Sequence, residues 1–418
     1  MTDEVLDVLI VGGGPAGACA GVLLAMGSRV GGQSLRVGLL EPKRPAAINH
    51  TDPIDSRVVA ISRASERILG TAGAWDRIDG PRICAYERMR VWHESVGVNS
   101  PEALVFDAAD AGEPNLGYII ESRLLQTALL DAFVETGGRV EAAQLVSLDV
   151  GAEYVAVKTN SGTLSARLVI GADGAQSAVR DAVGLTVESS DYRQTAIVAS
   201  VATQTDHDRT AWQRFMRNGT LAFLPLADGT SSIVWSADDE LAALLLAATP
   251  DEFATELDRA SDCALGSTRL VSERASFPLR RITAHRYVAH RCALVGDAAH
   301  VVHPLAGQGV NLGLLDAAVL AQTVLDARRE REDPGALRVL RQYERWRKSE
   351  LAIIGAAIDA FDRFLAHGTG PLARVAQQGL AWVNRSQEMK RFFISRALGV
   401  SGELPRAALG RAAPGRFK

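Results

Sequence analysis

Cysteine is scarce in this chain of 418 residues, and the few that occur are widely separated. The 4 cysteines, Cys19, Cys84, Cys263 and Cys292, form no CxxC pair. Their spacing excludes a metal cluster built on cysteines, and it is typical of a cytosolic protein that keeps its thiols reduced.

An excess of charge of one sign is also missing. The 45 Lys and Arg against 49 Asp and Glu leave a net charge of -4, without a basic block, so no general attraction to nucleic acid is expected. No stretch reaches the roughly 18 consecutive apolar residues of a membrane span, and the acidic start MTDEVLDVLIVGGG is unlike a signal peptide. The composition is that of a soluble globular protein of two or three domains, which we expect in the cytoplasm.

The N-terminal residues have the pattern of a βαβ unit. Residues 5–11 form a continuous apolar, β-branched run, which is typical of a strand buried on both faces. A glycine-rich turn follows, then helical residues 18–26, a loop, and a second short strand over 35–41. This order predicts an α/β fold that begins with a parallel, doubly wound sheet.

The glycine-rich turn has the spacing of a dinucleotide-binding loop. Gly12 permits a tight turn, Gly14 lets the backbone approach a pyrophosphate, and Gly17 lets the helix pack on the strand. Glu41, at the end of the second strand, is placed to accept hydrogen bonds from a ribose. The alternative is a plain βαβ turn with a surface Glu. FAD and NAD share this opening, and a second GxGxxG is absent from the sequence.

The rest of the chain alternates between predicted strands and helices. We expect a helix within 56–78 with Gly73 near its end, a strand over 88–95, a helix over 121–138, strands within 140–174, a β-rich stretch over 192–280 with a hairpin at 221–237, helices after 313, and a frayed tail over 404–418. The β-rich stretch indicates a second sheet outside the first βαβ unit.

The stretch ALVGDAAHVVHPLAGQGVNLG, residues 293–313, carries an acid, two imidazoles and several glycines between a buried strand and a helix. Asp297, His300 and His303 are spaced by three, as metal ligands on one helix face would be. Pro304 and the glycines after it break such a helix, and no further ligands complete a metal shell. A nucleophile lacks support, because there is no GxSxG elbow and no paired Cys.

A cofactor site explains more of this stretch. The strand that ends at Asp297 places a carboxylate where it can bind a sugar-like hydroxyl chain. The loop 304–313 has many free backbone N–H groups and opens a helix at about Asn311, whose N-terminus would stabilise negative charge. A reduced flavin carries such charge at its N1/O2 end, so this helix would favour reduction. A simple strand-to-helix turn would explain Gly296 and Asp297 but not the long glycine-rich connection.

Three motifs follow one another here as they do in class A flavin monooxygenases of the p-hydroxybenzoate hydroxylase fold: GGGPAG at 12–17, GADGAQSAVR at 171–180 and GDAAHVVHPLAGQGVNLG at 296–313. The chain resembles this family through about residue 350. Four stretches are more specifically similar to the ubiquinone-biosynthesis hydroxylases, which oxidise polyprenylated phenols: DSRVVAIS (55–62), GTLAFLPLADGTSSIVWS (219–236), HPLAGQGVNLGLLDAA (303–318) and ALGVSGELP (397–405).

The resemblance implies a Rossmann-like FAD-binding domain, an inserted β-sheet substrate domain and a helical C-terminal region. The FAD-binding domain would comprise 1–78, 118–187 and 281–335, the substrate domain 79–117 and 188–280, and the C-terminal helical region with its tail 336–418.

The resemblance also implies which residues bind FAD: Gly12, Gly14, Ala16, Gly17, Glu41, Arg57, Arg123, Asp173, Asp297, Pro304, Gly307, Gly309, Val310 and Asn311. Within this set Pro304, Gly307, Gly309 and Asn311, together with Gln308, would frame the isoalloxazine. Arg180 would contact phosphates of the nicotinamide cofactor. No metal and no acid–base residue is assigned, because the flavin performs the chemistry. For Arg57 and Arg123 the alternative is a surface or salt-bridging role.

A substrate pocket is expected on the predicted hairpin. Leu221, Phe223 and Pro225 alternate along its first strand, so they share one face of the sheet. We expect this face to line the pocket. The alternative for each side chain is ordinary sheet core.

The implied reaction hydroxylates an electron-rich aromatic ring. NADPH or NADH reduces FAD, and O2 then forms a flavin hydroperoxide that transfers OH to the ring and releases water. The resemblance favours a polyprenylated phenol of ubiquinone biosynthesis as substrate and other enzymes of that pathway as partners. Two alternatives stay open: a hydroxylase of the same fold for a soluble aromatic compound, and a flavoprotein that serves as a reductase or a non-catalytic assembly member.

A polyprenylated substrate resides in a bilayer, so the chain could contact the inner membrane. Residues 351–366 are strongly apolar and the terminal tail bears arginines, which suits a peripheral contact. We instead expect this helix to pack on the flavin domain or on a second subunit.

Overall fold

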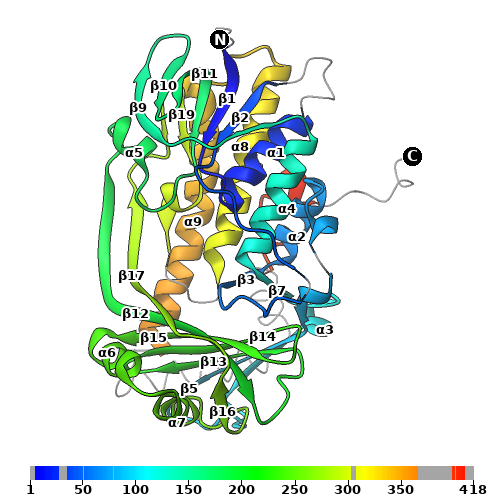
Figure 1. Ribbon diagram of the computed structural model, residues 1–418, viewed down its shortest axis with the longest axis vertical. Helices are drawn as coiled ribbons and strands as arrows, with labels where there is room; N and C mark the ends of the chain where they lie inside the picture. The colour runs from blue at the N-terminus through cyan, green and yellow to red at the C-terminus, as the bar shows by residue number, and fades with distance from the viewer. Residues whose placement is uncertain are drawn as a thin grey trace.

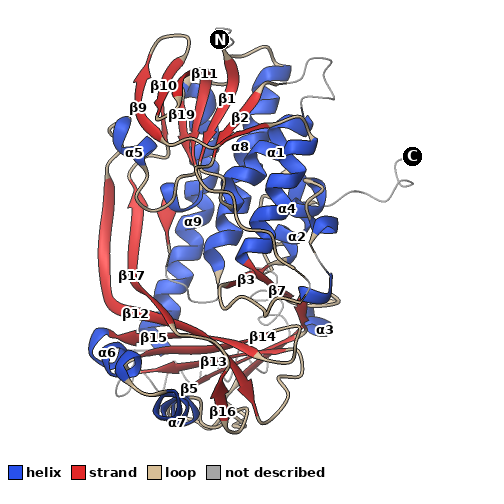
Figure 2. Cartoon of the chain, in the orientation of Figure 1, coloured by secondary structure: helices blue, strands red, loops and turns tan. Residues whose placement is uncertain are grey.

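The computed structural model describes residues 5–27, 35–49, 51–78, 80–302, 307–365, 398–400 and 402–409. Two large sheets lie toward opposite ends of its long axis, and most helices pack beside the upper sheet (Figure 1; Figure 2). Two long strands, β12 (Val187–Thr203) and β17 (Ala275–Ala284), run along the left of the view between the two ends. The predicted α/β class is confirmed, whereas the exact domain boundaries stay a prediction.

The upper sheet has 8 strands in the order β18-β19-β11-β1-β2-β8, with β10 beside β11 and β9 beside β10. Its centre is parallel, since β1 pairs with β11 and β2, and β11 pairs with β19. Val8, Leu9 and Ile10 in β1 are at most 1% exposed, as expected for a strand covered on both faces. The strands are β1 (Leu6–Val11), β2 (Val37–Leu40), β8 (Arg139–Glu141), β9 (Leu145–Val150), β10 (Val155–Thr159), β11 (Gly162–Gly171), β18 (Val288–Ala289) and β19 (Cys292–Leu294).

Helices cover this sheet, and the predicted strand–helix–strand order at the N-terminus is confirmed. They are α1 (Pro15–Gly27), α4 (Ser122–Glu135), α5 (Ala178–Ala182), α8 (Gln308–Arg329) and α9 (Leu337–Leu365). Helix α1 packs against α4 and α8, and α8 packs against α9. Among the described residues, α8 alone is long and apolar enough to cross a membrane, yet 78% of its most apolar window is buried inside the molecule, as in a core helix. The predicted packing of 351–366 concerns side chains that, beyond residue 352, lie outside the described residues.

A small sheet of 3 strands lies between the two large ones, in the order β3-β7-β4. Its strands are β3 (Val58–Ile61), β7 (Gly117–Glu121) and β4 (Cys84–Tyr86). The expected helix within 56–78 is therefore wrong at its start, because the β-branched run of β3 pairs with β7. Helix α2 (Arg63–Thr71) follows, and Gly73 lies just past its end with a φ of +66°. Short 3₁₀ turns at Trp75–Arg77 and Gly80–Arg82 lead into β4.

The lower sheet has 9 strands in the order β20-β17-β12-β15-β14-β13-β5-β6, with β16 beside β12. Its other strands are β5 (Arg88–His93), β6 (Leu104–Asp107), β13 (Thr210–Met216), β14 (Gly219–Pro225), β15 (Ser231–Asp238), β16 (Thr268–Leu270) and β20 (His300–Val301), with the short helix α3 (Ala108–Ala111) after β6. The predicted hairpin is β14–β15, which confirms the turn at 226–230.

Two helices in the β-rich stretch were not expected. They are α6 (Asp239–Ala247) and α7 (Pro250–Ala260), and α7 begins with a capping box in which Thr249 and Glu252 exchange hydrogen bonds. Leu245 of α6 and Phe253 of α7 pack into one hydrophobic cluster with side chains of β14 and β15. One face of the lower sheet is thus covered by these helices.

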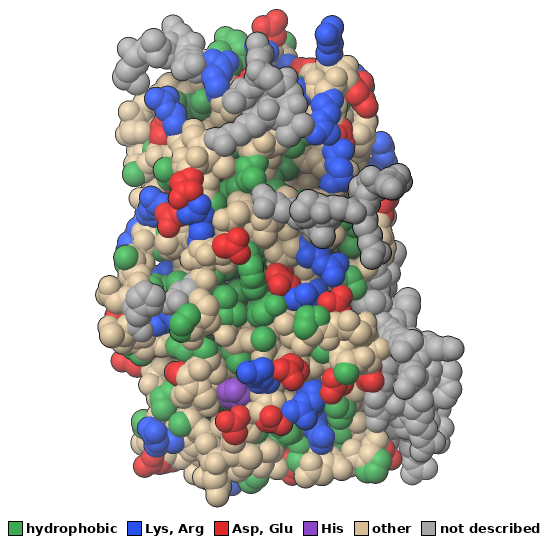
Figure 3. Space-filling view, turned by 90° about the vertical axis from the view of Figure 1, so that its right-hand side faces the viewer, with side chains coloured by type: hydrophobic (Ala, Val, Ile, Leu, Met, Phe, Trp, Pro, Cys, Tyr) green, Lys and Arg blue, Asp and Glu red, His purple; other side chains and the backbone are tan. Residues whose placement is uncertain are grey.

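The C-terminal segment packs against the upper part of the molecule. The Ala64 N–H donates to the Leu398 carbonyl (3.1 Å), and the Thr71 hydroxyl donates to the Ala407 carbonyl (3.0 Å). Ala408, in a 3₁₀ turn at Arg406–Ala408, is fully buried. The expected fraying is therefore wrong for 404–409, and 410–418 lie outside the described residues. On the face shown in Figure 3, charged side chains of both signs are interspersed and hydrophobic side chains gather near the middle.

Candidate cofactor site

The glycines between β1 and α1 differ in what a side chain would meet. A Cβ on Gly12, whose φ is +105°, would lie 2.3 Å from the Ala172 carbonyl oxygen, and one on Gly17 would lie 2.0 Å from the Gly12 oxygen. Both distances are far below van der Waals contact, so these positions require glycine for the turn and the helix–strand packing. A Cβ on Gly14 would meet no atom within 4 Å. Gly14 therefore leaves its backbone accessible from outside, as a pyrophosphate site needs.

Ala16 joins this turn to the distant 296–313 stretch. A Cβ built on Gly296 would lie 3.2 Å from the Ala16 Cβ, and one built on Gly313 would lie 3.1 Å from it. The start of α1, the turn after β19 and the first half of α8 therefore meet at three small residues. The two motifs, far apart in the sequence, form one site.

Glu41 ends β2 beside the glycine turn, where a ribose-binding acid was expected. Its Oε2 accepts a hydrogen bond from the Gly13 N–H (2.8 Å), and Oε1 accepts one from the Lys43 N–H (3.2 Å). An ionised carboxylate has about four acceptor positions, so capacity remains for ribose hydroxyls. The geometry is compatible with the predicted role.

Asp173 and Arg180 are occupied by the protein. Asp173 accepts from the Ser177 hydroxyl (2.5 Å) and the Val179 N–H (3.0 Å), which stabilises the start of α5. Arg180 is 6% exposed and donates to the carbonyls of Ala175 (3.0 Å) and Ala298 (3.3 Å). Both of these hydrogen bonds use Nη1, and the expected contact of Arg180 with a cofactor phosphate stays a prediction. Arg180 ties this motif to the turn after β19.

Asp297 lies in that turn, a 3₁₀ segment at Gly296–Ala298, and its side chain is exposed. Crowding by the surrounding protein raises the pKa of this carboxyl above its ordinary value, and the nearby His300 and Arg57 act in the opposite direction. An accessible but poorly solvated carboxylate suits hydroxyl donors, as predicted for ribitol.

Arg57 and Arg123 come together through the small sheet. Val58 pairs with Glu121, so the residues at the adjoining ends of β3 and β7 are neighbours. Asp55 lies between the two arginines: its Oδ1 accepts from the Arg57 N–H (3.0 Å), and its Oδ2 is 3.9 Å from Arg123 Nε. Arg57 is exposed and near Asp297, whereas Arg123 is half-buried.

A buried ion pair holds the segment that carries Arg57. Arg82 Nε and Nη2 donate to the two carboxylate oxygens of Glu121 at 2.7 and 2.8 Å, and Glu121 is fully buried. Arg82 also donates to the Asp52 and Pro53 carbonyls, and Glu121 accepts from the Asp55 N–H (2.8 Å). The sequence held no signal for this pair, because nothing local distinguishes Arg82 from a surface arginine.

Helix α8 begins earlier than expected, at Gln308 rather than near Asn311. Gly307 precedes it with a φ of +61°, a left-handed conformation that favours glycine. A Cβ on Gly309, in the first helical turn, would meet no atom of the described part of the chain within 4 Å, and Val310 packs partly buried against the core. The open first turn fits an anionic or flavin-like ligand. The predicted flavin-framing Pro304, and His303, lie outside the described residues.

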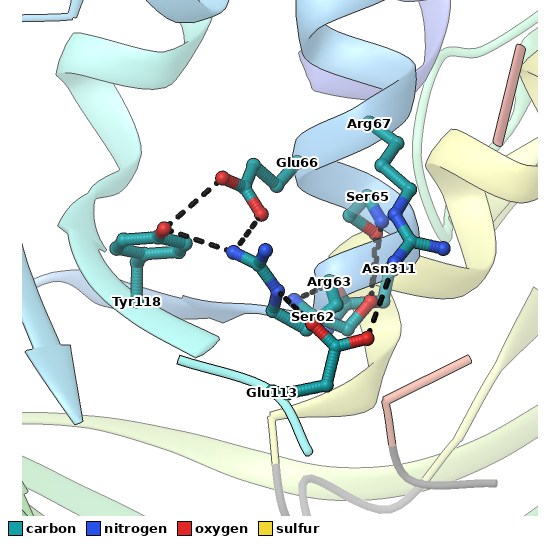
Figure 4. A network of polar contacts seen from close by, with 8 residues as sticks. All are labelled: Ser62, Arg63, Ser65, Glu66, Arg67, Glu113, Tyr118 and Asn311. Atoms are coloured by element: carbon teal, nitrogen blue, oxygen red, sulfur yellow. Dashed lines mark hydrogen bonds and ion pairs between the residues drawn. The ribbon is translucent and has the colours of Figure 1, made fainter. Parts of the chain in front are cut away.

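The Asn311 side chain hydrogen-bonds to the protein backbone, and its expected place beside a flavin ring stays a prediction. Its Oδ1 accepts from the Ser62 N–H (2.9 Å; Figure 4). Its Nδ2 donates to the carbonyls of Ala60 (2.8 Å) and Gly307 (3.3 Å). Asn311 therefore joins the β3–α2 junction to the start of α8.

A polar network fixes α2 on the other side of this junction (Figure 4). Arg63 pairs with Glu66 and Glu113, and its Nη1 donates to the Tyr118 hydroxyl (2.9 Å), which donates to Glu66 (3.0 Å). Burial raises the pKa of the Tyr118 hydroxyl, so it stays protonated as a donor. Because α2 is held in this way, Asn311 has a rigid partner.

The predicted pocket residues face away from the small sheet. Leu221 and Phe223 are 1% exposed and belong to the cluster with α6 and α7, and Pro225 has the same strand parity. The opposite face carries Leu224, which packs with the small sheet, and Ser232, whose hydroxyl donates to the Ser56 carbonyl (3.4 Å). Leu221 and Phe223 therefore pack in the sheet core, and their place in a substrate pocket stays a prediction. The alternation along β14 indicated that these side chains share one face of the strand, but it could not show which side of the sheet that face lies on.

Sequence reasoning also missed Asp316. It lies in the apolar run LLDAAVLAQ of α8 and is fully buried. A lone acid in such a run is itself a signal, because a buried carboxylate needs partners. Those partners include His300, which the sequence pattern suggested only as a metal ligand. No group of three or more His, Cys, Asp or Glu among the described residues is placed to hold a metal ion.

The sequence matches the family described as FAD binding domain over residues 5–351. It is 37% identical to the ubiquinone hydroxylase UbiL of Rhodospirillum rubrum over 404 residues, 95% of this chain and 90% of that protein. It is 34% identical to the 3-demethoxyubiquinol 3-hydroxylase of Escherichia coli over 404 residues, 96% of this chain and 100% of that protein. The structure is similar to the crystal structure of p-nitrophenol 4-monooxygenase from Pseudomonas putida, with a TM-score of 0.73, 18% identity, and coverage of 99% of this chain and 100% of that chain. At that identity the likeness shows the fold alone.

Proposed function

The chain belongs to the FAD binding domain family, and from this membership we propose that it is a FAD-dependent monooxygenase that hydroxylates the aromatic ring of a ubiquinone precursor. The enzyme is an oxidoreductase with FAD as its cofactor and NADPH or NADH as transient reductant. One turnover consumes NAD(P)H, a proton, O2 and the aromatic C–H, and yields NAD(P)⁺, the phenol and water.

The observation that carries the proposal is the meeting of three backbone segments at Ala16. They are the glycine turn before α1, the turn that bears Asp297, and the start of α8. Among the residues that the structure describes, none has an atom within 4 Å of a Cβ built at Gly14 or Gly309, which leaves room for a ligand at both backbones. These residues fit FAD, with pyrophosphate at the glycine turn and ribitol at Asp297.

Bound FAD supplies the redox chemistry by taking electrons from the nicotinamide cofactor and passing them to O2. The chain's own residues bind and orient. Glu41 offers carboxylate oxygens to the ribose, and Asp297 offers them to the ribitol hydroxyls. The first turn of α8 directs backbone N–H groups outward, where a helix N-terminus stabilises negative charge. The face of β14 and β15 that carries Leu224 is the one toward the small sheet, where an aromatic ring is to be held.

We propose a polyprenylated phenol as the substrate, because the chain is similar over nearly its whole length to two hydroxylases named for ubiquinone compounds. The shared fold with a p-nitrophenol monooxygenase supports no choice of substrate, since the identity is 18%. The proposal includes a cytoplasmic protein that contacts the inner membrane to reach this substrate, with other enzymes of the pathway as partners.

The test uses the purified full chain reconstituted with FAD. Prenylated phenols in detergent micelles and matched unprenylated phenols are supplied with NADPH or NADH under ¹⁸O2, and products are analysed by mass spectrometry. We expect one ¹⁸O in the product and a higher kcat/KM for the prenylated phenol. Oxidation of the nicotinamide cofactor without labelled product would contradict a hydroxylase. A preference for the unprenylated compound would favour the soluble-aromatic alternative.

A further inference from the structure

Asp316 of α8 is a fully buried carboxylate that accepts hydrogen bonds from three donors in two parts of the chain, the turn after β19 and helix α9. Its Oδ2 accepts from the Gly296 N–H (2.9 Å) and from His300 Nε2 (2.6 Å), and its Oδ1 accepts from Arg347 Nε (2.5 Å). His300 and Arg347 are 4% and 2% exposed. Such a buried group is costly unless every charge is paired, and here each is.

The first donor belongs to the turn that bears the predicted ribitol ligand. Gly296 has a φ of +60°, and its neighbour Asp297 is the exposed carboxylate of that turn. A hydrogen bond between an ionised acceptor and the Gly296 N–H fixes the backbone immediately before Asp297. Asp316 does not itself face the ligand, so its effect on a ligand must pass through this turn.

The second donor ends the same turn. His300 begins β20, where it pairs with Thr283 of the long strand β17, and its ring lies 5.8 Å from the Tyr287 ring. Asp316 thus holds the turn at both sides, at Gly296 and at His300. Because β17 continues into the lower sheet, the same contact joins the turn to the strand that leads there (Figure 1).

The third donor keeps the carboxylate charged. Arg347 comes from α9, whose Tyr343 hydroxyl donates to the Leu294 carbonyl (2.7 Å) at the end of β19. Burial acts to raise the pKa of Asp316, but the charges and hydrogen bonds of His300 and Arg347 lower it overall. Asp316 is therefore an anion at neutral pH.

We propose that Asp316 is a positioning residue for FAD, which orients the Asp297 carboxylate by holding Gly296 and His300 on either side of it. Arg347 supports it by compensating its charge. This rests on the proposed function, because it assumes that Asp297 binds FAD.

The first measurement is the FAD dissociation constant of the apoprotein, from quenching of FAD fluorescence. We expect Asp316→Asn to weaken FAD binding at least tenfold. Asp326→Asn is the matched control: it is the same change on the same helix, at a residue that pairs only at the surface with Arg329 and Arg406. The control should bind FAD as the wild type does.

A double-mutant cycle with Asp297→Ala separates positioning from a general loss of structure. If Asp316 acts through Asp297, Asp316→Asn should weaken binding in the wild-type background and by less than about threefold in the Asp297→Ala background. Equal losses in both backgrounds would overturn the proposal, because they would show that Asp316 acts only on the fold. No loss in the wild-type background would also overturn it.

Variants at His300 keep the test available if Asp316→Asn does not fold. His300→Gln retains an amide donor toward Asp316, whereas His300→Ala removes it. We expect His300→Ala to weaken FAD binding and His300→Gln to retain most of the wild-type affinity. As for Asp316→Asn, this difference should be seen only in proteins that keep Asp297. Equal affinities for the two variants would contradict the proposal. A wild-type protein that binds no FAD would instead refute the proposed function.

Discussion

At the residue scale, the carboxylates of the site divide by what already occupies them. Asp173 caps α5, Glu121 pairs with Arg82, and Asp316 is enclosed by three donors. Asp297 is the exposed one, and its pKa is raised rather than lowered. Asp297 therefore keeps acceptor positions for a ligand, as Glu41 does although it also accepts from two backbone N–H groups.

Replacing Asp297 should therefore affect FAD more than the fold. A raised folded-state pKa means that ionisation of this carboxyl opposes folding at neutral pH, so Asp297→Ala should not lower the stability of the apoprotein. Loss of a hydrogen bond to a charged group costs about 1.5–3 kcal/mol, roughly a 10- to 150-fold weaker FAD affinity. Fluorescence titration measures this, with Asp149→Ala on β9 as an exposed control. Wild-type affinity in Asp297→Ala would assign Asp297 a purely structural role.

At the element scale, the first turn of α8 and the glycine turn before α1 both have positions where a Cβ would contact none of the described residues within 4 Å. Gly309 is the position in α8, so a larger side chain there would reach outward without a clash with the described residues. The residue at which α8 begins determines whether Gly309 lies in the helix. Beginning at Gln308 instead of near Asn311, α8 brings Gly309 into the helix and directs its N-terminal N–H groups at the predicted flavin.

Gly309→Val should weaken FAD binding or lower the flavin reduction potential while circular dichroism stays near native. The side chain would displace the ring from the N–H groups that stabilise the reduced form. Gly70→Val is the matched control, because Gly70 lies in α2 and its Cβ also meets nothing within 4 Å. The measurements are the FAD occupancy, from absorbance, and the flavin reduction potential, from equilibration with a redox dye. If both equal the wild-type values, this loop does not contact the flavin.

Strand β14 offers a second comparison, between its two faces. Phe223 is enclosed by the cluster with α6 and α7, so Phe223→Ala should lose about 3–5 kcal/mol in urea unfolding. Leu224 is partly buried on the face toward the small sheet, so Leu224→Ala should cost less stability and raise the KM for the aromatic substrate. A raised KM for Phe223→Ala without loss of stability would place the substrate on the opposite face.

At the scale of the whole molecule, buried charges connect parts that no single element spans. Asp316 joins α8, α9 and the turn after β19, and Arg82 with Glu121 joins the small sheet to the segment before β3. Each pair costs desolvation and is stable only when complete. These contacts therefore form only when the elements of the upper part are packed together.

Acid should destabilise the apoprotein in part through Asp316. Its folded pKa lies below the ordinary value of 3.8, so its contribution is fully present above that value and is lost as pH falls through the lowered folded pKa. Asp316→Asn should lose about 3–5 kcal/mol at pH 7, because it leaves Arg347 unpaired, and should show a shallower fall in stability below about pH 4. Urea unfolding at several pH values measures both. Parallel pH curves for the two proteins would show that Asp316 is not ionised in the fold.

The sequence by itself determined the parts of this protein that depend on local chemistry. The apolar run before Gly12, the glycine spacing and the acid that ends the second strand predicted the βαβ unit, and the three ordered motifs predicted the FAD family. These succeed because a tight turn, a buried strand and a helix start each require particular residues within a few positions of one another.

Only the tertiary structure decided which side chains are left for ligands. The Asn311 side chain looks like a ligand residue in the sequence, but it hydrogen-bonds to the backbone of the distant β3–α2 junction, and Arg180 donates to the distant Ala298 carbonyl. Alternation in β14 could not reveal that α6 and α7 cover the face of Phe223. The physical reason is that the element packed against a side chain decides whether its polar atoms are already hydrogen-bonded and whether its face of a strand is buried. The fold, and not the neighbouring residues in the sequence, determines which element that is.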